Sequence, residues 1–438
     1  MIFIYAGTGS PRQEYIFRLV FGHWLRLPFR IIDEPGQFDP TEGVLINYSL
    51  KNIPGSVRIT PSGLLSEDRI REFQPLHLLT GEQWVLFPLD DEKSALSFDI
   101  FSAVFWLITR YEEYLPFRLD PYGRFEVQES LMWKCGVHRL PVVDLWLNRL
   151  TRLLQQYDPY LKAANSEFEF LPTYDIDQTW SYLHKGFSRN TAGLIRDLLL
   201  FRWQNAALRV KVLRGRKTDP FDCFAWLDYL HEACNLKPLY FIHPGTYGKY
   251  DKNIPLLHPA HSARIRELGQ TNDIGIHPSF LSFENTELLK REIGQLSFVL
   301  GREITKARQH FLRIRLPETY RRYIECGITD DYSLGWAGDS GYRAGTSRSF
   351  PFYDLERENA TPLMLHPLSM MDGAYQVYRK ISAEESALEA AAMAEYQKDT
   401  GGRLITLWHN ESLSDQGQWK GWRPVYEHIL RTITGIRS

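Results

Sequence analysis

Short apolar runs alternate with amphipathic helical patterns from Phe168 to the end of the chain. Each run has the length of one strand and is followed by polar or titratable residues. A helix between two strands returns the chain to the same edge of a sheet, so the strands on either side of it are parallel. The active sites of such sheets and barrels lie at the carboxyl ends of the strands. The pattern therefore predicts an α/β fold with its functional residues at those ends.

The first of these strands ends in Leu-Pro-Thr-Tyr-Asp-Ile-Asp, which places carboxylates at Asp175 and Asp177. Residues two apart on a strand point to the same side, and two neighbouring acids repel each other. A cation beside them removes that repulsion, so that one acid binds the metal while the other transfers protons. The alternative is a turn in which Asp177 caps the helix that follows.

Further strand ends also carry titratable side chains. One of these strands is expected over Ile304–Leu312. It carries Arg308 and His310, which are two residues apart and should therefore face the same side. An isolated histidine is usually structural, but several such residues at one edge of a sheet are more specific than any single motif. The residues at these strand ends are His277, Arg308 with His310, and His409.

The first part of the chain predicts a smaller α/β unit without a catalytic constellation. The glycine-containing stretch Ala6–Ser10 follows the first expected strand, but it matches neither the dinucleotide fingerprint nor the phosphate loop. An ordinary strand-to-helix turn is the better interpretation. The polar stretch Asp158–Ser166 is the expected junction, which predicts an N-terminal domain over residues 1–165 and a second domain over 166–438.

Composition narrows the functional classes. The net charge is −2, so nothing global points to nucleic acid or to an anionic membrane. The apolar run Ile100–Ile108 is too short to span a bilayer, and the first residues lack the basic region and the length of a signal peptide. The four cysteines form no CxxC pair, which favours free thiols in a reducing compartment. We therefore expect a cytoplasmic protein without a transmembrane segment or a nucleic-acid partner.

Two other segments invite a binding role. Gly186–Lys217 predicts a helix that ends in a basic cluster, which is either a solvated face or a contact for phosphate or an acidic glycan. Asp331–Phe352 predicts a long loop, and long ordered loops are often functional. Its residues Trp336, Tyr342 and Arg343 are candidates for a wall that stacks on sugars. Core packing of the two aromatic residues, and pairing of the arginine with a nearby aspartate, are the alternatives.

At these residues the chain resembles the polysaccharide deacetylases, the NodB-homology or carbohydrate esterase family 4 group. The order of motifs is similar: an Asp-x-Asp, a histidine followed by Pro-Ser, a strand with arginine, an aromatic loop and a late Leu-x-His. The resemblance covers residues 166–438 and implies a distorted (β/α) barrel. In particular it looks like a bacterial branch with an extra N-terminal α/β domain. It implies catalytic roles for Asp175 as base, His409 as acid and Arg308 as the residue that orients the base. It also implies that Asp177 and His277 bind a metal ion.

The chain departs from the family at one metal ligand. The second metal-binding histidine of the family lies four residues after the first, where this chain has Leu281. We hypothesise that His310 replaces it; Ser279 or Ser282 with a water molecule is the rival. Asp and His ligands suit one divalent metal ion, with zinc favoured over cobalt, nickel or iron.

The resemblance implies hydrolysis of the acetyl group of an N-acetylated sugar or polysaccharide precursor. The metal would activate water, Asp175 would act as base, and His409 would act as acid. The alternative is a catalytically degenerate protein of this fold that binds a glycan or a partner, which Leu281 favours. A hydrolase of phosphates or other esters fits the same metal site, but no second metal cluster is evident in the sequence.

Overall fold

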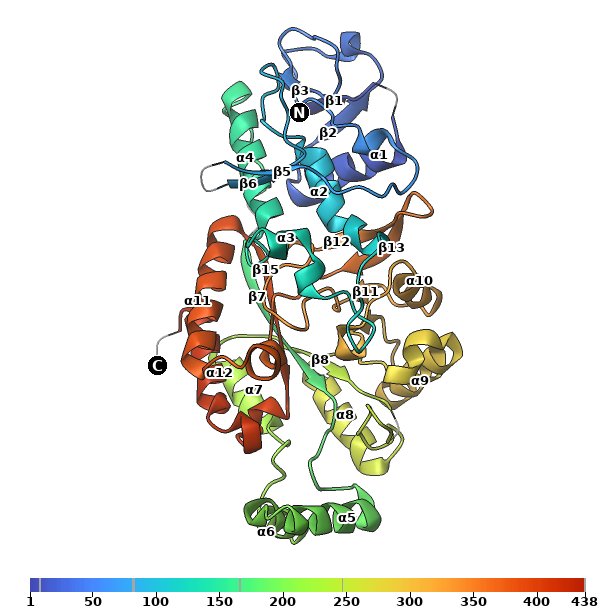
Figure 1. Cartoon of the computed structure of the whole chain (residues 1–438), viewed down its shortest axis with the longest axis vertical. Helices are drawn as coiled ribbons and strands as arrows, with labels where there is room; N and C mark the ends of the chain where they lie inside the picture. Colours follow the sequence, from blue (N-terminus) through green and yellow to red (C-terminus); the bar gives the residue numbers. More distant parts are fainter. Residues whose placement is uncertain (8, 81–82, 165–166, 246, 437–438) are drawn as a thin grey trace.

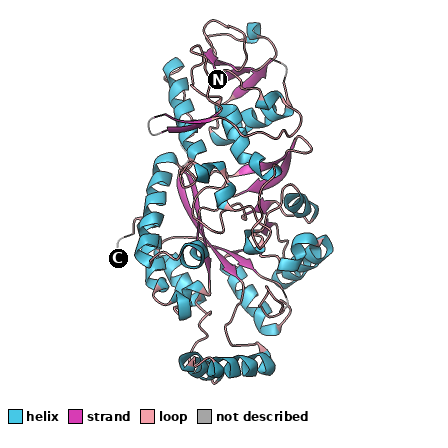
Figure 2. Cartoon of the chain, in the orientation of Figure 1, coloured by secondary structure: helices cyan, strands magenta, loops and turns pink. Residues whose placement is uncertain are grey.

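The computed structural model describes every residue except 8, 81–82, 165–166, 246 and 437–438. The molecule is elongated, with the N-terminal part at one end, a large sheet in the middle and a pair of helices projecting at the other end (Figure 1). Helices flank the strands in both the N-terminal part and the rest of the chain (Figure 2).

The N-terminal part contains a four-stranded parallel sheet in the order β2-β1-β3-β4. Ser10 and Gln13 cap the first helix reciprocally, which supports the predicted strand-to-helix turn. The strands are β1 (Ile2–Tyr5), β2 (Phe29–Ile32), β3 (Val44–Asn47), β4 (Val57–Arg58) and an antiparallel hairpin, β5 (His77–Thr80) and β6 (Gln83–Leu86). The helices are α1 (Pro11–Phe17), α2 (Ile100–Ile108), α3 (Leu131–Lys134) and α4 (Val142–Tyr157).

The rest of the chain forms a nine-stranded sheet in the order β12-β13-β11-β10-β9-β8-β7-β15-β14. All neighbours are parallel except β12 and β13, which are antiparallel. The strands are β7 (Phe168–Ile176), β8 (Leu239–Ile242), β9 (Asp273–Ile276), β10 (Lys306–Ala307), β11 (Asp330–Asp331), β12 (Phe350–Asp354), β13 (Asn359–Leu365), β14 (Met370–Met371) and β15 (Gly402–His409). The helices are α5 (Gly186–Leu199), α6 (Trp203–Leu213), α7 (Phe224–Ala233), α8 (Pro259–Thr271), α9 (Thr286–Leu300), α10 (Glu318–Glu325), α11 (Ala383–Thr400) and α12 (Trp422–Thr434).

The predicted α/β fold with a largely parallel sheet is confirmed. Strand β8 is an apolar run buried over its whole length, as expected for a central strand covered on both faces. The register aligns the carboxyl ends of the strands, because Asp175 on β7 lies opposite His409 on β15. Among the described residues no ladder joins β12 to β14, so the sheet is open at both edges and not a closed barrel.

Two predicted elements differ from the structure. The strand expected over Ile304–Leu312 is only β10, and a 3₁₀ turn follows it from His310 to Leu312. The backbone of Phe311 is left-handed, with φ of 60°, which no strand accommodates. The helix expected over Gly186–Lys217 is two helices, α5 and α6, because the chain turns at Phe201, where φ is 54°.

The loop that precedes β12 packs against the N-terminal part. At Gly341 an added Cβ atom would lie 2.3 Å from the carbonyl oxygen of His138, so only glycine permits this approach. A buried ionic network, here called the interface cluster, joins the two sides. Both carboxylate oxygens of Glu113 accept hydrogen bonds from Arg343, at 2.8 and 2.7 Å. The cluster consists of Arg110, Glu112, Glu113 and Arg343.

This packing corrects the prediction of a sugar-stacking wall. Trp336, Tyr342 and Arg343 are all buried, and the two arginines of the interface cluster lie over the Trp336 ring. The loop is long because it fills the space between the two parts of the molecule. Its side chains are therefore not accessible to a sugar, and core packing, the alternative interpretation, describes the two aromatic residues.

Candidate active site

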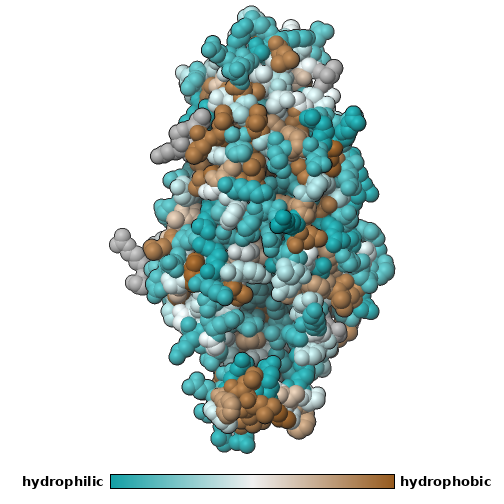
Figure 3. Space-filling model, in the orientation of Figure 1, coloured by the Kyte–Doolittle hydropathy of each residue, from teal (hydrophilic) through white to brown (hydrophobic). Residues whose placement is uncertain are grey.

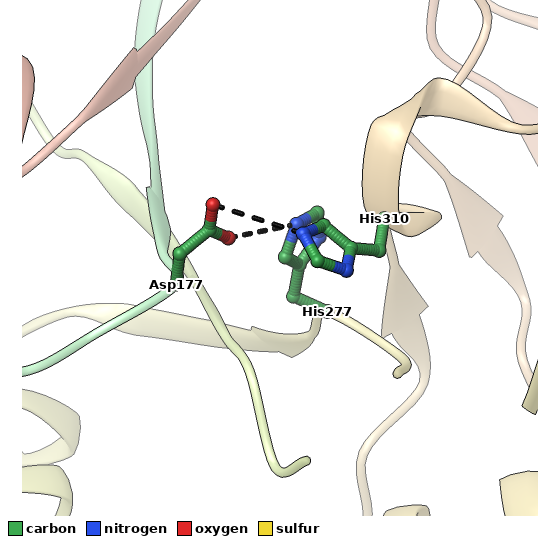
Figure 4. A group of neighbouring side chains, drawn as sticks. All are labelled: Asp177, His277 and His310. Carbon is green, nitrogen blue, oxygen red and sulfur yellow. Dashed lines mark ion pairs between the residues drawn. The ribbon is translucent and has the colours of Figure 1, made fainter. Parts of the chain in front are cut away.

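The carboxyl ends of the strands bring the predicted site residues together. Asp177, just beyond β7, lies at the centre of the site. Its two carboxylate oxygens face three imidazole rings that come from three other segments of the chain. The Nε2 atoms lie 3.2 Å away for His277, 3.7 Å for His310 and 3.9 Å for His409. Figure 4 shows Asp177 pointing toward the rings of His277 and His310. We call Asp175, Asp177, His277, His310 and His409 the strand-end cluster.

The protonation of His277 follows from its partner. Its Nδ1 atom lies 2.6 Å from the backbone carbonyl of Arg308, and a carbonyl oxygen only accepts, so Nδ1 carries the hydrogen. In the neutral form of this ring, the Nε2 atom holds a lone pair that faces Oδ1 of Asp177, 3.2 Å away. Neither this nitrogen nor Oδ1 of Asp177 has a hydrogen-bond partner among the described residues, although both are buried. Two buried acceptors face to face are costly unless a cation lies between them.

His310 directs a third possible ligand atom to the same place. Its Nδ1 atom donates to Asp251, at 3.2 Å, which turns Nε2 toward Asp177. Histidines that bind metals commonly donate their other nitrogen to a carboxylate or carbonyl in this way. The side chains of Asp177, His277 and His310 could each offer one ligand atom to a metal ion. The residues thus fit a three-ligand metal site, and His310 lies beside the other two although it is on a turn and not on a strand.

A second group of possible ligands shares His310: it includes His243 and Asp251. The backbone N–H of Gly245 donates to Nδ1 of His243, at 3.0 Å, so the hydrogen of this ring is on Nε2. That Nε2 donates to Asp251, at 2.9 Å, and no nitrogen of His243 remains for a metal. Asp251 and His243 therefore support His310 and do not form a second metal site with it.

Asp175 lies beside the three-ligand site without belonging to it. Its Oδ1 accepts a hydrogen bond of 3.0 Å from Arg308, and its Oδ2 lies 3.6 Å from Nε2 of His277. Arg308 is fully buried, and it also donates to the backbone carbonyl of Tyr332. The arginine therefore holds one carboxylate oxygen and leaves the other directed toward the candidate metal site.

His409 is held from behind by Asp372. Its Nδ1 atom donates to this carboxylate at 2.8 Å, and the backbone N–H of His409 donates to the other oxygen at 2.7 Å. The hydroxyl of Ser412 also donates to Asp372. Burial lowers the pKa of His409, but the nearby carboxylates outweigh it and raise the pKa to about 10. His409 is therefore protonated at neutral pH, with its Nε2–H toward Asp177.

The same balance applies to His310. Burial lowers its pKa, but the charges and hydrogen bonds of Asp177 and Asp251 raise it to about 9. A proton on His310 thus balances the carboxylates where a metal ion would otherwise do so.

Sequence reasoning missed the two supporting carboxylates, Asp251 and Asp372. Asp251 lies in the polar and aromatic loop after β8, which was a weak signal, whereas Asp372 follows β14, a strand of two residues that no pattern indicated. Leu281, at the position of the absent histidine, is 72% exposed and lines a cavity of about 600 Å³. Tyr250 and Phe280 stack at 4.1 Å in that cavity, beside Asp251.

Comparisons with known proteins add distant likenesses. Residues 2–159 match the model of a family of unknown function (DUF7033). No match is found among curated proteins.

Among solved structures, the chain is similar to three hydrolytic proteins. A protein from Mycobacterium smegmatis described as a polysaccharide deacetylase is 12% identical; the match covers 62% of this chain and 86% of that one, with a TM-score of 0.41. The Puue allantoinase is 10% identical over 61% of this chain and 84% of its own, with a TM-score of 0.38. A polysaccharide deacetylase from Bacillus cereus is 12% identical over 62% and 88%, with a TM-score of 0.26. At these TM-scores the likeness assigns no function to this chain. Any functional proposal must rest on the residues of the site.

Proposed function

We propose that this protein is a metal-dependent hydrolase that removes an acetyl group from an N-acetylated sugar or polysaccharide precursor. The observation that carries the proposal is the strand-end cluster, in which two buried acceptors, Nε2 of His277 and Oδ1 of Asp177, face each other without partners. The polysaccharide-deacetylase resemblance belongs to the same proposal.

Asp177, His277 and His310 would hold the metal, with zinc as the favoured ion. When bound, a divalent ion polarises the acetyl carbonyl and lowers the pKa of water from about 15.7 toward about 7. Three protein ligands leave a coordination position open, as in catalytic zinc sites. Asp251 and the carbonyl of Arg308 would fix the two imidazole rings.

The remaining residues would move protons. Asp175, oriented by Arg308, has one carboxylate oxygen free to accept a proton from water. His409 carries a proton at neutral pH and is directed at the same place, so it would give that proton to the leaving amine. Assistance of this kind typically contributes about 10²–10⁴-fold each. The base and the acid have separate supporting residues, which suits two different roles.

The alternative, a degenerate protein that binds a glycan without catalysis, has Leu281 in its favour. In the proposed site the third ligand is His310, which comes from another part of the chain. A leucine at position 281 therefore does not prevent metal binding. Measuring metal content of the purified protein, together with acetate release from chito-oligosaccharides, separates the two functions. We expect about one metal ion per chain in the wild type, its loss in His310→Ala, and its retention in Leu281→His.

Metal kept in His310→Ala would contradict the ligand assignment. A wild-type protein that binds one metal ion but releases acetate from none of a panel of N-acetylated saccharides would contradict deacetylation. It would favour the glycan-binding alternative or a different hydrolase.

A further inference from the structure

The helices α5 and α6 form a hairpin that projects from the sheet at the end of the molecule toward which β7 runs (Figure 1). Here the hairpin means residues 186–217. Arg209 on α6 pairs with Asp197 on α5 at 2.9 Å, which joins the two helices. Asp219 accepts hydrogen bonds from the backbone N–H groups of residues 181, 182 and 183. These bonds join the connecting segment that enters the hairpin to the one that leaves it.

Large apolar side chains are exposed on this hairpin. The exposed fraction is 88% for Phe187, 72% for Leu199, 77% for Phe201 and 59% for Trp203. Figure 3 shows a hydrophobic patch at this end of the molecule. The other members of the apolar patch are Ile195, Leu198, Leu200 and Leu213. Solvent-exposed patches of this kind mark a surface that is covered by a partner or a membrane.

The charge of the hairpin indicates whether a protein partner or a membrane covers the patch. Residues 186–217 contain eight lysines and arginines and one aspartate, a net charge of +7, whereas the whole chain carries −2. The single aspartate is buried in its pair with Arg209. Six of the basic residues are exposed, and none of these has an ion-pair partner in the part of the chain that the structure describes: Arg196, Arg202, Lys211, Arg214, Arg216 and Lys217.

We infer that the α5–α6 hairpin docks the protein on an anionic lipid bilayer. An apolar face with aromatic residues, flanked by unpaired cations, is the composition of helices that lie in the membrane interface. The patch lies on a convex, projecting end, which a deformable bilayer covers more readily than a rigid protein with a matching hollow. The near-neutral charge of the whole chain concealed this local excess. Docking here does not depend on the proposed hydrolase activity.

The test is sedimentation of the purified full chain with vesicles of phosphatidylcholine alone and with vesicles that also contain phosphatidylglycerol. We expect binding to the anionic vesicles, weakened by high salt. The Phe201→Ser/Trp203→Ser variant should lower the partition coefficient about tenfold or more, because two aromatic side chains no longer insert. Arg214→Glu/Arg216→Glu should remove the preference for anionic lipid.

The matched control is Phe298→Ser/Leu388→Ser, since these residues are 76% and 72% exposed on α9 and α11, away from the hairpin. It should bind like the wild type, and thermal unfolding followed by circular dichroism confirms that all variants fold. Wild type that does not sediment with anionic vesicles, or a control that loses as much binding as the hairpin variant, would overturn the inference. So would a dimer in sedimentation velocity that Phe201→Ser/Trp203→Ser dissociates, because a second copy would then cover the patch. None of these readouts requires metal or hydrolysis, so they are independent of the proposed function.

Discussion

The interface cluster and the strand-end cluster are both buried and ionic, but their hydrogen bonding differs. In the interface cluster every charged group has partners: Glu112 accepts from Arg110, Ser130 and the backbone of Leu131, and Glu113 accepts from both arginines. In the strand-end cluster, Nε2 of His277 and Oδ1 of Asp177 have none among the described residues.

The difference separates structure from function. A buried ionic group that is fully paired gains nothing from a ligand and serves the packing of the two parts of the chain. A buried group with acceptors left over is destabilised until something with positive charge or a donor arrives. Mutations should therefore affect the unfolding free energy at the interface cluster and affect metal binding and rate at the strand-end cluster.

The largest effect is expected at Asp175, on the functional side of the comparison. Asp175→Asn removes the proposed base but not a metal ligand, so metal content should stay at about one per chain while acetate release falls about 10²–10⁴-fold. Elemental analysis and an acetate assay on the same preparation measure both. Asp177→Asn is the matched control and should lose the metal as well. Unchanged acetate release in Asp175→Asn would remove this residue from the mechanism.

At the interface cluster, Glu113→Ala should lower the free energy of unfolding by about 3–5 kcal/mol, because two buried arginines lose their common partner. Chemical denaturation measures this change. Glu126→Ala, at a nearby exposed carboxylate, should stay within about 0.5 kcal/mol of the wild type. If both variants have the same stability, the interface cluster is not what holds the two parts together.

A smaller effect is expected from the residue that supports His310. Asp251→Asn should weaken metal affinity about 10–100-fold, since the carboxylate no longer orients the ring. Competition with a chelator of known affinity measures the dissociation constant. Asp222→Asn, at a partly buried aspartate that pairs with Arg264, is the control and should leave the affinity unchanged. Equal affinities in wild type and Asp251→Asn would mean that metal binding does not depend on the hydrogen bond from His310 to Asp251.

The smallest expected effect is on the pH dependence of the unfolding free energy, through Asp339 in the loop that packs against the N-terminal part. Burial raises the pKa of Asp339, but His138, Arg139 and Arg379 outweigh it and lower the pKa to about 2. The unfolded value is about 3.9, so the stabilisation is complete above that pH and is lost as the pH falls toward 2. Between those values the unfolding free energy of the wild type should fall by about 1 kcal/mol more than that of Asp339→Asn. Parallel pH profiles for the two proteins would contradict this.

The sequence determined the class of fold and the edge that carries the site. Alternating strands and helices, with titratable residues at the strand ends, predicted the parallel sheet and the meeting of a set of site residues. These are Asp175, Asp177, His277, Arg308, His310 and His409. These are consequences of local periodicity, because side-chain direction on a strand and the direction of parallel strands follow from short stretches of chain.

Only the tertiary structure decided which atoms remain unpaired. His310 reaches the site from a left-handed turn, and Asp251 and Asp372 arrive from loops without a pattern. Arg343 pairs with Glu113, which lies 230 residues away in the sequence. The arginine that was expected to contact a sugar is therefore part of a buried ion pair. The exposure of the α5–α6 hairpin likewise depends on what does not pack against it. The physical reason is that partners and burial are set by packing between distant segments, which no local pattern records.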